Sequence, residues 1–153
     1  MRNLKKVLLG LLVCLMVAGC GSQKAVKLDV QATSDAIFET YFTEMAPIAY
    51  DAEYVEAMFG LTADQYESFA GFYPMISAVA TDVAVFEAKE GKVEEVKTAV
   101  EAYRELKKAN AWYPLETENA EKAVVYVNGN YVFFIMAENV DAVAAHVEGL
   151  FAE

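Results

Sequence analysis

Cysteine and histidine are scarce in this chain, and their scarcity excludes several kinds of chemistry. The 153 residues contain 2 cysteines and 1 histidine. Structural zinc sites take four ligands, most of them thiolates or imidazoles, so we expect no metal site of this kind. No calcium loop with the usual aspartate spacing occurs either, and no bound cofactor is expected.

Motifs that support catalysis are also missing. The sequence has no Gly-x-Ser-x-Gly, no Ser-x-x-Lys and no glycine-rich loop of the kind that holds phosphates. The single histidine, His146, lies beside the apolar stripe of a predicted helix, which favours a structural residue over a base or a metal ligand. Carboxylate pairs such as Glu94 with Glu95 lie in polar stretches, whereas a working acid/base pair needs one member in an apolar setting. We therefore predict no catalytic residue and a protein that is not an enzyme.

Basic residues are few relative to acidic ones. Lys and Arg total 12 against 23 Asp and Glu, for a formal net charge of -11. An acidic body of this size repels phosphate backbones and anionic headgroups, so nucleic acid is not expected as a partner. The acidity is typical of a solvated surface, with attraction of basic ligands as the alternative.

The first twenty residues carry the most specific signal in the sequence. Residues 1–6 hold three cations and no acid, and residues 7–17 are apolar apart from Gly10. That run is about the length of a signal-peptide core and well short of the roughly 20 residues that span a bilayer. It ends on Val17-Ala18-Gly19-Cys20, where small residues precede a thiol. We predict cleavage between Gly19 and Cys20 and attachment of diacylglyceryl and palmitate lipid to Cys20.

Cleavage would change what the rest of the chain can do. Residues 1–19 hold three basic residues and no acid, so their removal leaves 9 basic against 23 acidic residues, a net charge of -14. Acylation consumes the remaining cysteine, so no disulfide can form. We expect residues 20–29 to be a lipidated tether and residues 30–153 to fold as one extracytoplasmic domain. The lipid on Cys20 then holds the protein in the cell membrane, facing the outside of the cytoplasmic membrane.

Helix signals dominate the beginning of this domain. Apolar residues recur at helical spacing over residues 35–45, with Thr33 or Ser34 as the cap and Pro47 as the stop. A second helix is predicted over residues 52–59, capped by Asp51 and closed by Gly60. Residues 27–30 indicate a short edge strand.

Two hairpins and two helices follow. An irregular edge strand at residues 68–77 and a regular strand at 83–89 form the first pair, and a long helix starts at residue 93. Runs at residues 123–127 and 131–136 flank Asn128-Gly129-Asn130, a strong hairpin signal because a type I′ turn needs positive φ at both central residues. A last helix begins after Asn139. We predict an α+β domain with an antiparallel sheet of about four strands, in two hairpins, covered on one face by amphipathic helices and preceded by short N-terminal helices.

Three of these features together resemble a known group of proteins. They are the sequence at Cys20, the strand Val83-Ala84-Val85-Phe86-Glu87-Ala88-Lys89 before a charged helix, and the hairpin Val125-Tyr126-Val127-Asn128-Gly129-Asn130-Tyr131-Val132. Over roughly residues 30–150 the chain resembles short lipoproteins of Gram-positive anaerobes that carry a domain of unknown function. The resemblance implies a membrane-tethered extracytoplasmic domain and brings no catalytic residue with it.

The aromatic residues suggest where a partner would bind. The chain has nine tyrosines, and several of them alternate with acidic residues in the N-terminal half. Either these tyrosine rings fill a core, or the rings and the neighbouring carboxylates bind a sugar or a peptide. The trio Trp112-Tyr113-Pro114 follows the long helix, and Pro114 disfavours helix at Tyr113. We predict that Trp112 and Tyr113 lie in a loop and belong to a binding surface. The alternative is that Trp112 folds back as a lid over the sheet.

Three functions fit these features. The first is a non-enzymatic surface lipoprotein that binds a protein, a peptide or a small ligand. The second is an accessory or structural subunit of a cell-envelope complex, and the third is an enzyme that uses carboxylates. A concave pocket lined by tyrosines would favour the first, a flat apolar patch the second, and two carboxylates in a dry cleft the third.

Replacing Cys20 tests the lipoprotein prediction. Cys20→Ala removes the thiol that lipid transfer requires, so the chain should remain an unprocessed precursor and take up no lipid. Metabolic labelling with a fatty-acid analogue measures this, with Cys14→Ala as the matched control because Cys14 lies in the segment that is cut off. Equal lipid incorporation in the two variants would contradict the prediction.

Overall fold

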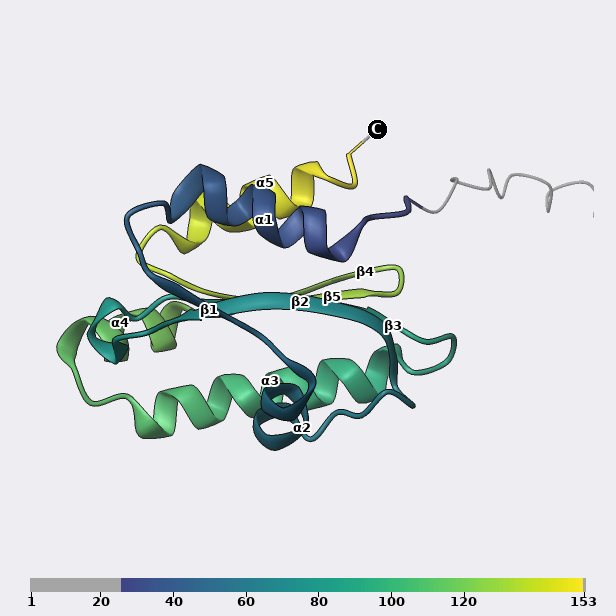
Figure 1. Cartoon of the computed structure of the whole chain (residues 1–153), viewed down its shortest axis with the longest axis horizontal. Coiled ribbons are helices and arrows are strands. Elements are labelled where there is room, and N and C mark those ends of the chain that lie inside the picture. The colour runs from purple at the N-terminus through teal and green to yellow at the C-terminus, as the bar shows by residue number, and fades with distance from the viewer. Residues whose placement is uncertain (1–25, 153) are drawn as a thin grey trace, which may run out of the picture.

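The fold is a five-stranded antiparallel sheet between two layers of helices (Figure 1). The computed structural model describes residues 26–152, so the predicted signal sequence, Gly19 and Cys20 lie outside the described residues. Within that range, no helix is both long enough and apolar enough to cross a membrane. The layers follow from where apolar residues lie along each element.

The first helix, α1 (Val30–Tyr41), begins earlier than the sequence indicates. The Asp29 carboxylate caps it by accepting the backbone N–H of Ala32 at 2.9 Å. The predicted edge strand at residues 27–30 is therefore wrong, and so is the choice of Thr33 or Ser34 as the cap, because both are buried within the helix. A carboxylate that satisfies a free N–H group of the first turn stabilises the earlier start.

The second helix, α2 (Ala52–Phe59), has the predicted bounds. The Asp51 carboxylate accepts the backbone N–H of Tyr54 at 2.7 Å and caps the first turn. Gly60 ends the helix with a φ of 68°, a left-handed conformation that carries no steric penalty for glycine. The sequence predicts this helix well because both its cap and its stop are strong local signals.

Two hairpins form most of the sheet, as predicted. Antiparallel pairs join β2 (Tyr66–Pro74) to β3 (Asp82–Ala88) and β4 (Val124–Asn128) to β5 (Tyr131–Met136). The tight turn of the second hairpin consists of Gly129 and Asn130, because Asn128 still pairs with Tyr131. Within this turn, positive φ occurs at Gly129, with 58°, and not at Asn130, so the turn differs from the predicted type I′ turn.

The sequence does not predict the fifth strand, β1 (Pro47–Ala49). It pairs antiparallel with β2, and the strand order is β1-β2-β3-β5-β4. The edge position expected for residues 68–77 is therefore corrected, since β1 lies outside β2. Pro47 lacks an N–H group, which a sheet tolerates at its edge. The α+β class with an antiparallel sheet is confirmed, with five strands where about four are predicted.

Helices cover both faces of the sheet, whereas the sequence predicts one covered face. One face packs against α1 and α5 (Val140–Gly149), and the other packs against α2, α3 (Val93–Asn110) and α4 (Pro114–Lys122) (Figure 1). The cause lies in the central strands. In β3, Val83 and Val85 face α1 and α5, while Ala84 and Phe86 face α3, and every residue of β5 is buried. A sheet with two apolar faces needs a helical layer on each.

A glycine in β2 permits a close approach between strands. A Cβ atom at Gly71 would lie 2.5 Å from the carbonyl oxygen of Val83 and 2.9 Å from the ring of Tyr50. The Gly71 carbonyl also accepts the backbone N–H of Tyr50 at 2.9 Å. The missing side chain therefore lets the Tyr50 ring pack directly against the backbone of β2.

Adding that side chain should destabilise the fold. In Gly71→Ala the new methyl group meets a backbone oxygen that cannot move independently, and we expect a loss of about 3 kcal/mol in the free energy of unfolding. Gly149→Ala is the matched control, because nothing lies within 4 Å of its Cβ and its φ is not positive. Urea denaturation measures both variants. Equal stabilities would contradict the close approach at Gly71.

Candidate functional site

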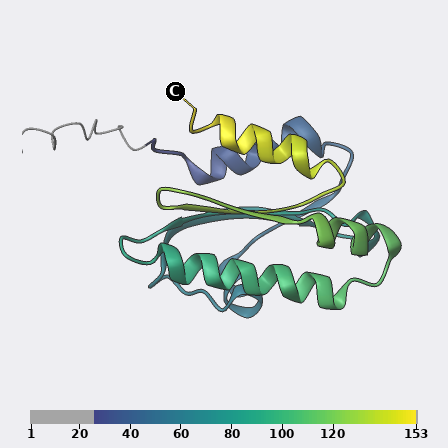
Figure 2. The ribbon, with the colours of Figure 1, turned by 180° about the vertical axis from the view of Figure 1, so that it is seen from behind.

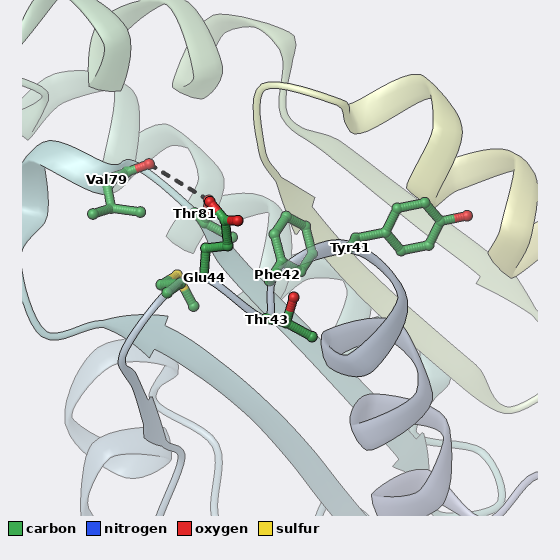
Figure 3. A pocket seen from close by; sticks show the side chains of 7 residues that line it. Tyr41, Phe42, Thr43, Glu44, Val79 and Thr81 are labelled. Carbon is green, nitrogen blue, oxygen red and sulfur yellow. Dashed lines mark hydrogen bonds between the residues drawn. The ribbon is translucent and has the colours of Figure 1, made fainter.

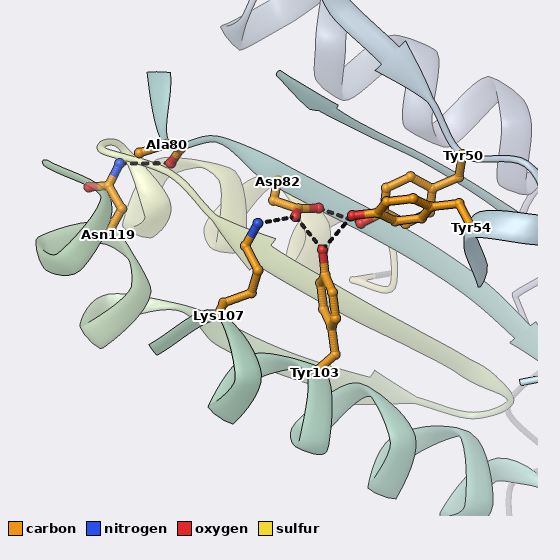
Figure 4. Close-up of polar contacts among 7 residues, drawn as sticks. All are labelled: Tyr50, Tyr54, Ala80, Asp82, Tyr103, Lys107 and Asn119. Carbon is orange, nitrogen blue, oxygen red and sulfur yellow. Dashed lines mark hydrogen bonds and ion pairs between the residues drawn. The ribbon is translucent and has the colours of Figure 1, made fainter. Parts of the chain in front are cut away.

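A buried carboxylate, that of Asp82, lies at the start of β3 on the face that α3 covers (Figure 4). Its relative exposure is 0%. The Tyr50 hydroxyl donates to one carboxylate oxygen, and the Tyr103 hydroxyl donates to the other at 2.6 Å. The ammonium of Lys107 lies 3.0 Å from that second oxygen and forms an ion pair with it. Both oxygens of the carboxylate therefore have partners within the chain.

Further tyrosines connect this carboxylate to the molecular surface. The hydroxyls of Tyr54 and Tyr103 share a hydrogen bond of 2.8 Å. The Tyr54 ring stacks on Tyr73 with centroids 4.4 Å apart, and it lies 4.8 Å from the Tyr50 ring. The Asp82 network, as used below, consists of Tyr50, Tyr54, Asp82, Tyr103 and Lys107.

The phenols of the Asp82 network are poor acids. Burial, and after it the charge of Asp82, raises the pKa of Tyr50 well above its usual value. The same two causes, in the same order, raise the pKa of Tyr54 and of Tyr103. All three hydroxyls therefore stay protonated at neutral pH and act as hydrogen-bond donors. A phenolate base or nucleophile is not available here.

The segment before Asp82 is held in a conformation that most side chains avoid. Ala80 has a φ of 55°, and its carbonyl accepts the side-chain amide of Asn119 at 3.0 Å (Figure 4). Asn119 belongs to α4 and is 1% exposed. The short helix η1 (Ser77–Val79), which precedes Ala80, is therefore fixed against α4. The network and this contact tie the start of β3 to α2, α3 and α4, which is a structural role.

Exposed apolar side chains gather where β2 ends and β3 begins. Within residues 26–152, the exposed large hydrophobic side chains fall in two segments, 75–79 and 106–115. The first contains η1, and the second runs from the end of α3 into the start of α4; both lie at the same end of the sheet (Figure 1). The η1-end patch consists of Met75, Ile76, Val79, Leu106, Trp112, Tyr113 and Leu115.

Trp112 and Tyr113 lie between the two helices, where the sequence places them. Trp112 is 86% exposed and Tyr113 is 47% exposed, so Trp112 does not act as a lid over the sheet. The Glu116 carboxylate accepts the backbone N–H of Trp112 at 2.9 Å and thereby orders the segment. Pro114 is the first residue of α4, a helix that the sequence does not predict because its buried residues, Asn119 and Ala120, form no apolar stripe.

A shallow groove of about 320 Å³ adjoins the η1-end patch (Figure 3). It is lined by Tyr41, Phe42, Thr43, Glu44, Met45, Val79 and Thr81. A neighbouring hollow shares Tyr41 and Val79 and continues to Glu138 and Asn139 at the start of α5. Neither hollow is lined by Tyr50, whose hydroxyl donates to Asp82, or by Tyr54, whose hydroxyl bonds that of Tyr103.

His146 joins the two helices on the other face of the sheet. Its Nδ1 atom lies 3.3 Å from the Tyr41 hydroxyl, and the two rings pack edge to face with centroids 5.6 Å apart. This contact between α1 and α5 agrees with the predicted place of His146 at a helix edge. Among the residues that the structure describes, no group of three or more His, Cys, Asp or Glu side chains is placed to hold a metal ion.

These features define a three-layer α+β domain with a structural polar network in its core and an apolar patch at one end. The chain belongs to the family described as Domain of unknown function (DUF4358), whose model matches residues 41–137, more than half of its length. No curated protein and no solved structure matches the chain. The matched range contains all five strands with α2, α3 and α4, while α1 and α5 flank it. The expected membership of a family of unknown function is confirmed over this range.

Asp82 and its partners are not predicted from the sequence. An aspartate immediately before an apolar strand is typical of a turn, and the hydroxyls that bind it come from residues 32 and 21 positions away. One signal was available. Tyr103 and Lys107 are four residues apart on α3, so they share a face, and Tyr103 continues the buried stripe of Val96 and Val100. A lysine beside that stripe is compatible with a buried acid elsewhere in the fold, but it equally suits a solvated side chain at the end of a helix.

The Asp82 network should make the fold sensitive to alkaline pH. Tyrosines of the unfolded chain lose their protons near pH 10, whereas the raised pKa values of Tyr50, Tyr54 and Tyr103 keep these protons bound in the folded chain. The folded state then binds more protons, so its stability is complete below about pH 10 and falls as the pH rises further. Urea unfolding at about pH 8 and about pH 11 measures the loss.

Tyr103→Phe provides the control for this pH dependence. The variant should be less stable at about pH 8, because Asp82 loses a buried donor, a loss worth roughly 1–3 kcal/mol. Its stability should also fall less steeply above about pH 10, because one raised pKa is gone. A pH dependence identical to that of the parent chain would show that Tyr103 is not one of the responsible groups.

Proposed function

We propose that this protein is a lipid-anchored extracytoplasmic binding protein that docks onto another protein through the η1-end patch. The observation that carries the proposal is the 86% exposure of Trp112, flanked by other exposed apolar side chains. Clusters of this kind are rare on monomeric proteins without a binding role. Tryptophan and tyrosine are also enriched among the residues that contribute most to binding.

Protein association is favoured over capture of a small ligand. Sites for small molecules enclose most of the ligand surface in a deep, mainly apolar cavity. The groove beside the η1-end patch is shallow and is lined in part by Glu44 and two threonines. Exposed apolar side chains beside a shallow groove instead fit association with another protein.

Binding is likewise favoured over catalysis. Asp82 is the buried carboxylate of the described residues, and its own hydroxyl and ammonium partners occupy both oxygens. The tyrosines around it have raised pKa values and stay neutral. An acid/base pair needs two groups with different pKa values, and both groups must reach the same substrate. The Asp82 network has no open position at which a substrate could bind.

The proposed anchor leaves the η1-end patch accessible. The backbone N–H of Leu28 donates to the Tyr131 hydroxyl at 2.9 Å, which holds the start of the described chain beside the β4–β5 turn. That turn and η1 lie at opposite ends of the strands, because Asp82 pairs with Met136 and Glu87 pairs with Tyr131. Lipid on Cys20 would attach six residues before Val26, within roughly 20 Å at full extension. The lipid is then attached near the turn, at the end of the strands opposite the patch.

Removing both rings of the patch tests the docking role. In the full chain, tagged at its C-terminus and expressed in cells, Trp112→Ala with Tyr113→Ala should reduce capture of the co-purifying partner at least tenfold, since each hot-spot ring contributes about 2 kcal/mol. Stability should change by only about 0.5 kcal/mol, because Trp112 is exposed. Quantitative mass spectrometry and thermal melting measure the two effects.

The matched control is Glu94→Ala with Glu95→Ala, two exposed positions at the other end of α3. This variant should retain parental capture. Equal capture by all three proteins would refute docking through the η1-end patch. A large drop in melting temperature for the ring variant would mean that the two rings support the fold.

A further inference from the structure

The two edges of the sheet are protected very differently. The β1 edge has only three residues and starts with a proline, and both features discourage another strand from pairing. The opposite edge is β4, which has five residues, no proline and no charged side chain. Its register with β5 runs from Val124 to Asn128 without a bulge. β4 therefore lacks the protections that usually keep an edge strand from pairing.

Part of the β4 backbone points away from the sheet. In a hairpin with a two-residue turn, the pair beside the turn is hydrogen-bonded, here Asn128 with Tyr131, and bonded pairs then alternate with non-bonded pairs. Val125 and Val127 consequently direct their N–H and C=O groups outward. Within the described residues no backbone hydrogen bond from outside the ladder reaches them. The hairpin lies between the α1–α5 layer and α3, as the view in Figure 2 shows.

The side chains along this edge determine what can pair with it. Val125 and Val127 pack toward α3, while Val124 and Tyr126 pack toward α5, and all four are half-buried. An incoming strand must therefore be apolar on both of its faces. Residues 123–137 contain no Asp, Glu, Lys, Arg or His in a chain of net charge -11. This strand therefore adds no like-charge repulsion between two copies of the acidic protein.

We propose that β4 is the interface of a two-fold symmetric homodimer, in which the β4 strands of two copies pair antiparallel. With Tyr126 opposite its counterpart, Val125 faces Val127 of the second copy in a hydrogen-bonded pair. All the outward N–H and C=O groups of both strands are then satisfied. The same patch meets itself across the axis, which is the isologous arrangement of a closed dimer. One continuous sheet runs through both copies.

The symmetry suits two copies in one membrane. A two-fold axis perpendicular to the sheet keeps the α1–α5 layers of both copies on the same side, and each chain enters α1 from that side (Figure 1). Both proposed tethers then leave toward the same bilayer, which raises the local concentration of the partners. The η1-end patch shares no residue with β4. The dimer is therefore independent of the proposed docking role.

Cysteine cross-linking of the full chain in isolated membranes tests the dimer. Tyr126→Cys places two thiols across a non-hydrogen-bonded pair, where Cβ atoms lie about 4.5–5.5 Å apart, close enough for a disulfide. Val124→Cys is the matched control, because Val124 lies on the same face but would face Asn128 of the second copy, roughly 13 Å from its own counterpart. Mild oxidation should link the Tyr126→Cys chain into a dimer on a non-reducing gel. The Val124→Cys chain and the parent chain should stay unlinked.

A proline at the interface distinguishes a cross-link that depends on pairing of the β4 strands from one that forms by random collision. In the Tyr126→Cys chain, Val127→Pro removes an outward N–H and leaves the bonds to β5 intact, so it should abolish the cross-link. Val127→Ala keeps the N–H and should retain it. Should thermal melting show that Val127→Pro does not fold, Val125→Pro replaces it. Equal cross-linking at positions 124 and 126, or a cross-link that survives the proline in a folded chain, overturns the proposal.

Sedimentation in detergent gives an independent measurement. The parent chain should form a dimer whose affinity increases with salt, because salt screens the repulsion between two acidic bodies. A chain that remains monomeric at every concentration and salt level also overturns the proposal.

Discussion

Strands β3 and β5 are apolar on both faces, and most of the architecture is a consequence of that constraint. Each face must be removed from water, and burying one large aliphatic or aromatic side chain contributes about 1.5–3 kcal/mol. α3 with α2 and α4 covers one face, and α1 with α5 covers the other. The region matched by the DUF4358 family contains only the first of these layers. α1 and α5 are therefore integral parts of the fold, since without them Val83, Val85, Phe133 and Ile135 would face water.

Asp82 is the charged residue buried in the described core, and its position explains how the tyrosines around it are used. A buried charge costs several kcal/mol unless it is paired and fully hydrogen-bonded. Tyr50, just before α2, and Tyr103 with Lys107, both on α3, supply those partners. Because the hydroxyls of Tyr50 and Tyr103 point inward to the carboxylate, these two rings do not form a ligand pocket. The network instead fixes α2 and α3 relative to the start of β3, and Asn119 fixes α4 to the same place.

The surfaces suited to partners lie where these layers end. The η1-end patch comes from the connection between β2 and β3 and from the segment where α3 ends and α4 begins, and its apolar side chains are exposed. The β4 edge results from the strand order, which leaves Val125 and Val127 without a neighbouring strand. The two surfaces involve different physics: exposed rings bind by burying apolar area, whereas an edge strand binds through backbone hydrogen bonds.

Local signals in the sequence were sufficient for α2 and for the two hairpins. Asp51 and Gly60 bound α2 through contacts within a few residues, and the glycine at 129 turns the second hairpin. The loop position of Trp112 follows from the end of one helix and the proline that starts the next, whereas its exposure, as opposed to a lid over the sheet, is seen only in the structure. Tertiary structure alone decided the second helical layer, the strand β1 and the partners of Asp82. In each case the interacting groups are far apart in sequence and the local pattern is compatible with several arrangements. The helices must cover both apolar faces of β3 and β5 at the same time. This requirement selects one arrangement of the helices, and in that arrangement the carboxylate of Asp82 also has its partners.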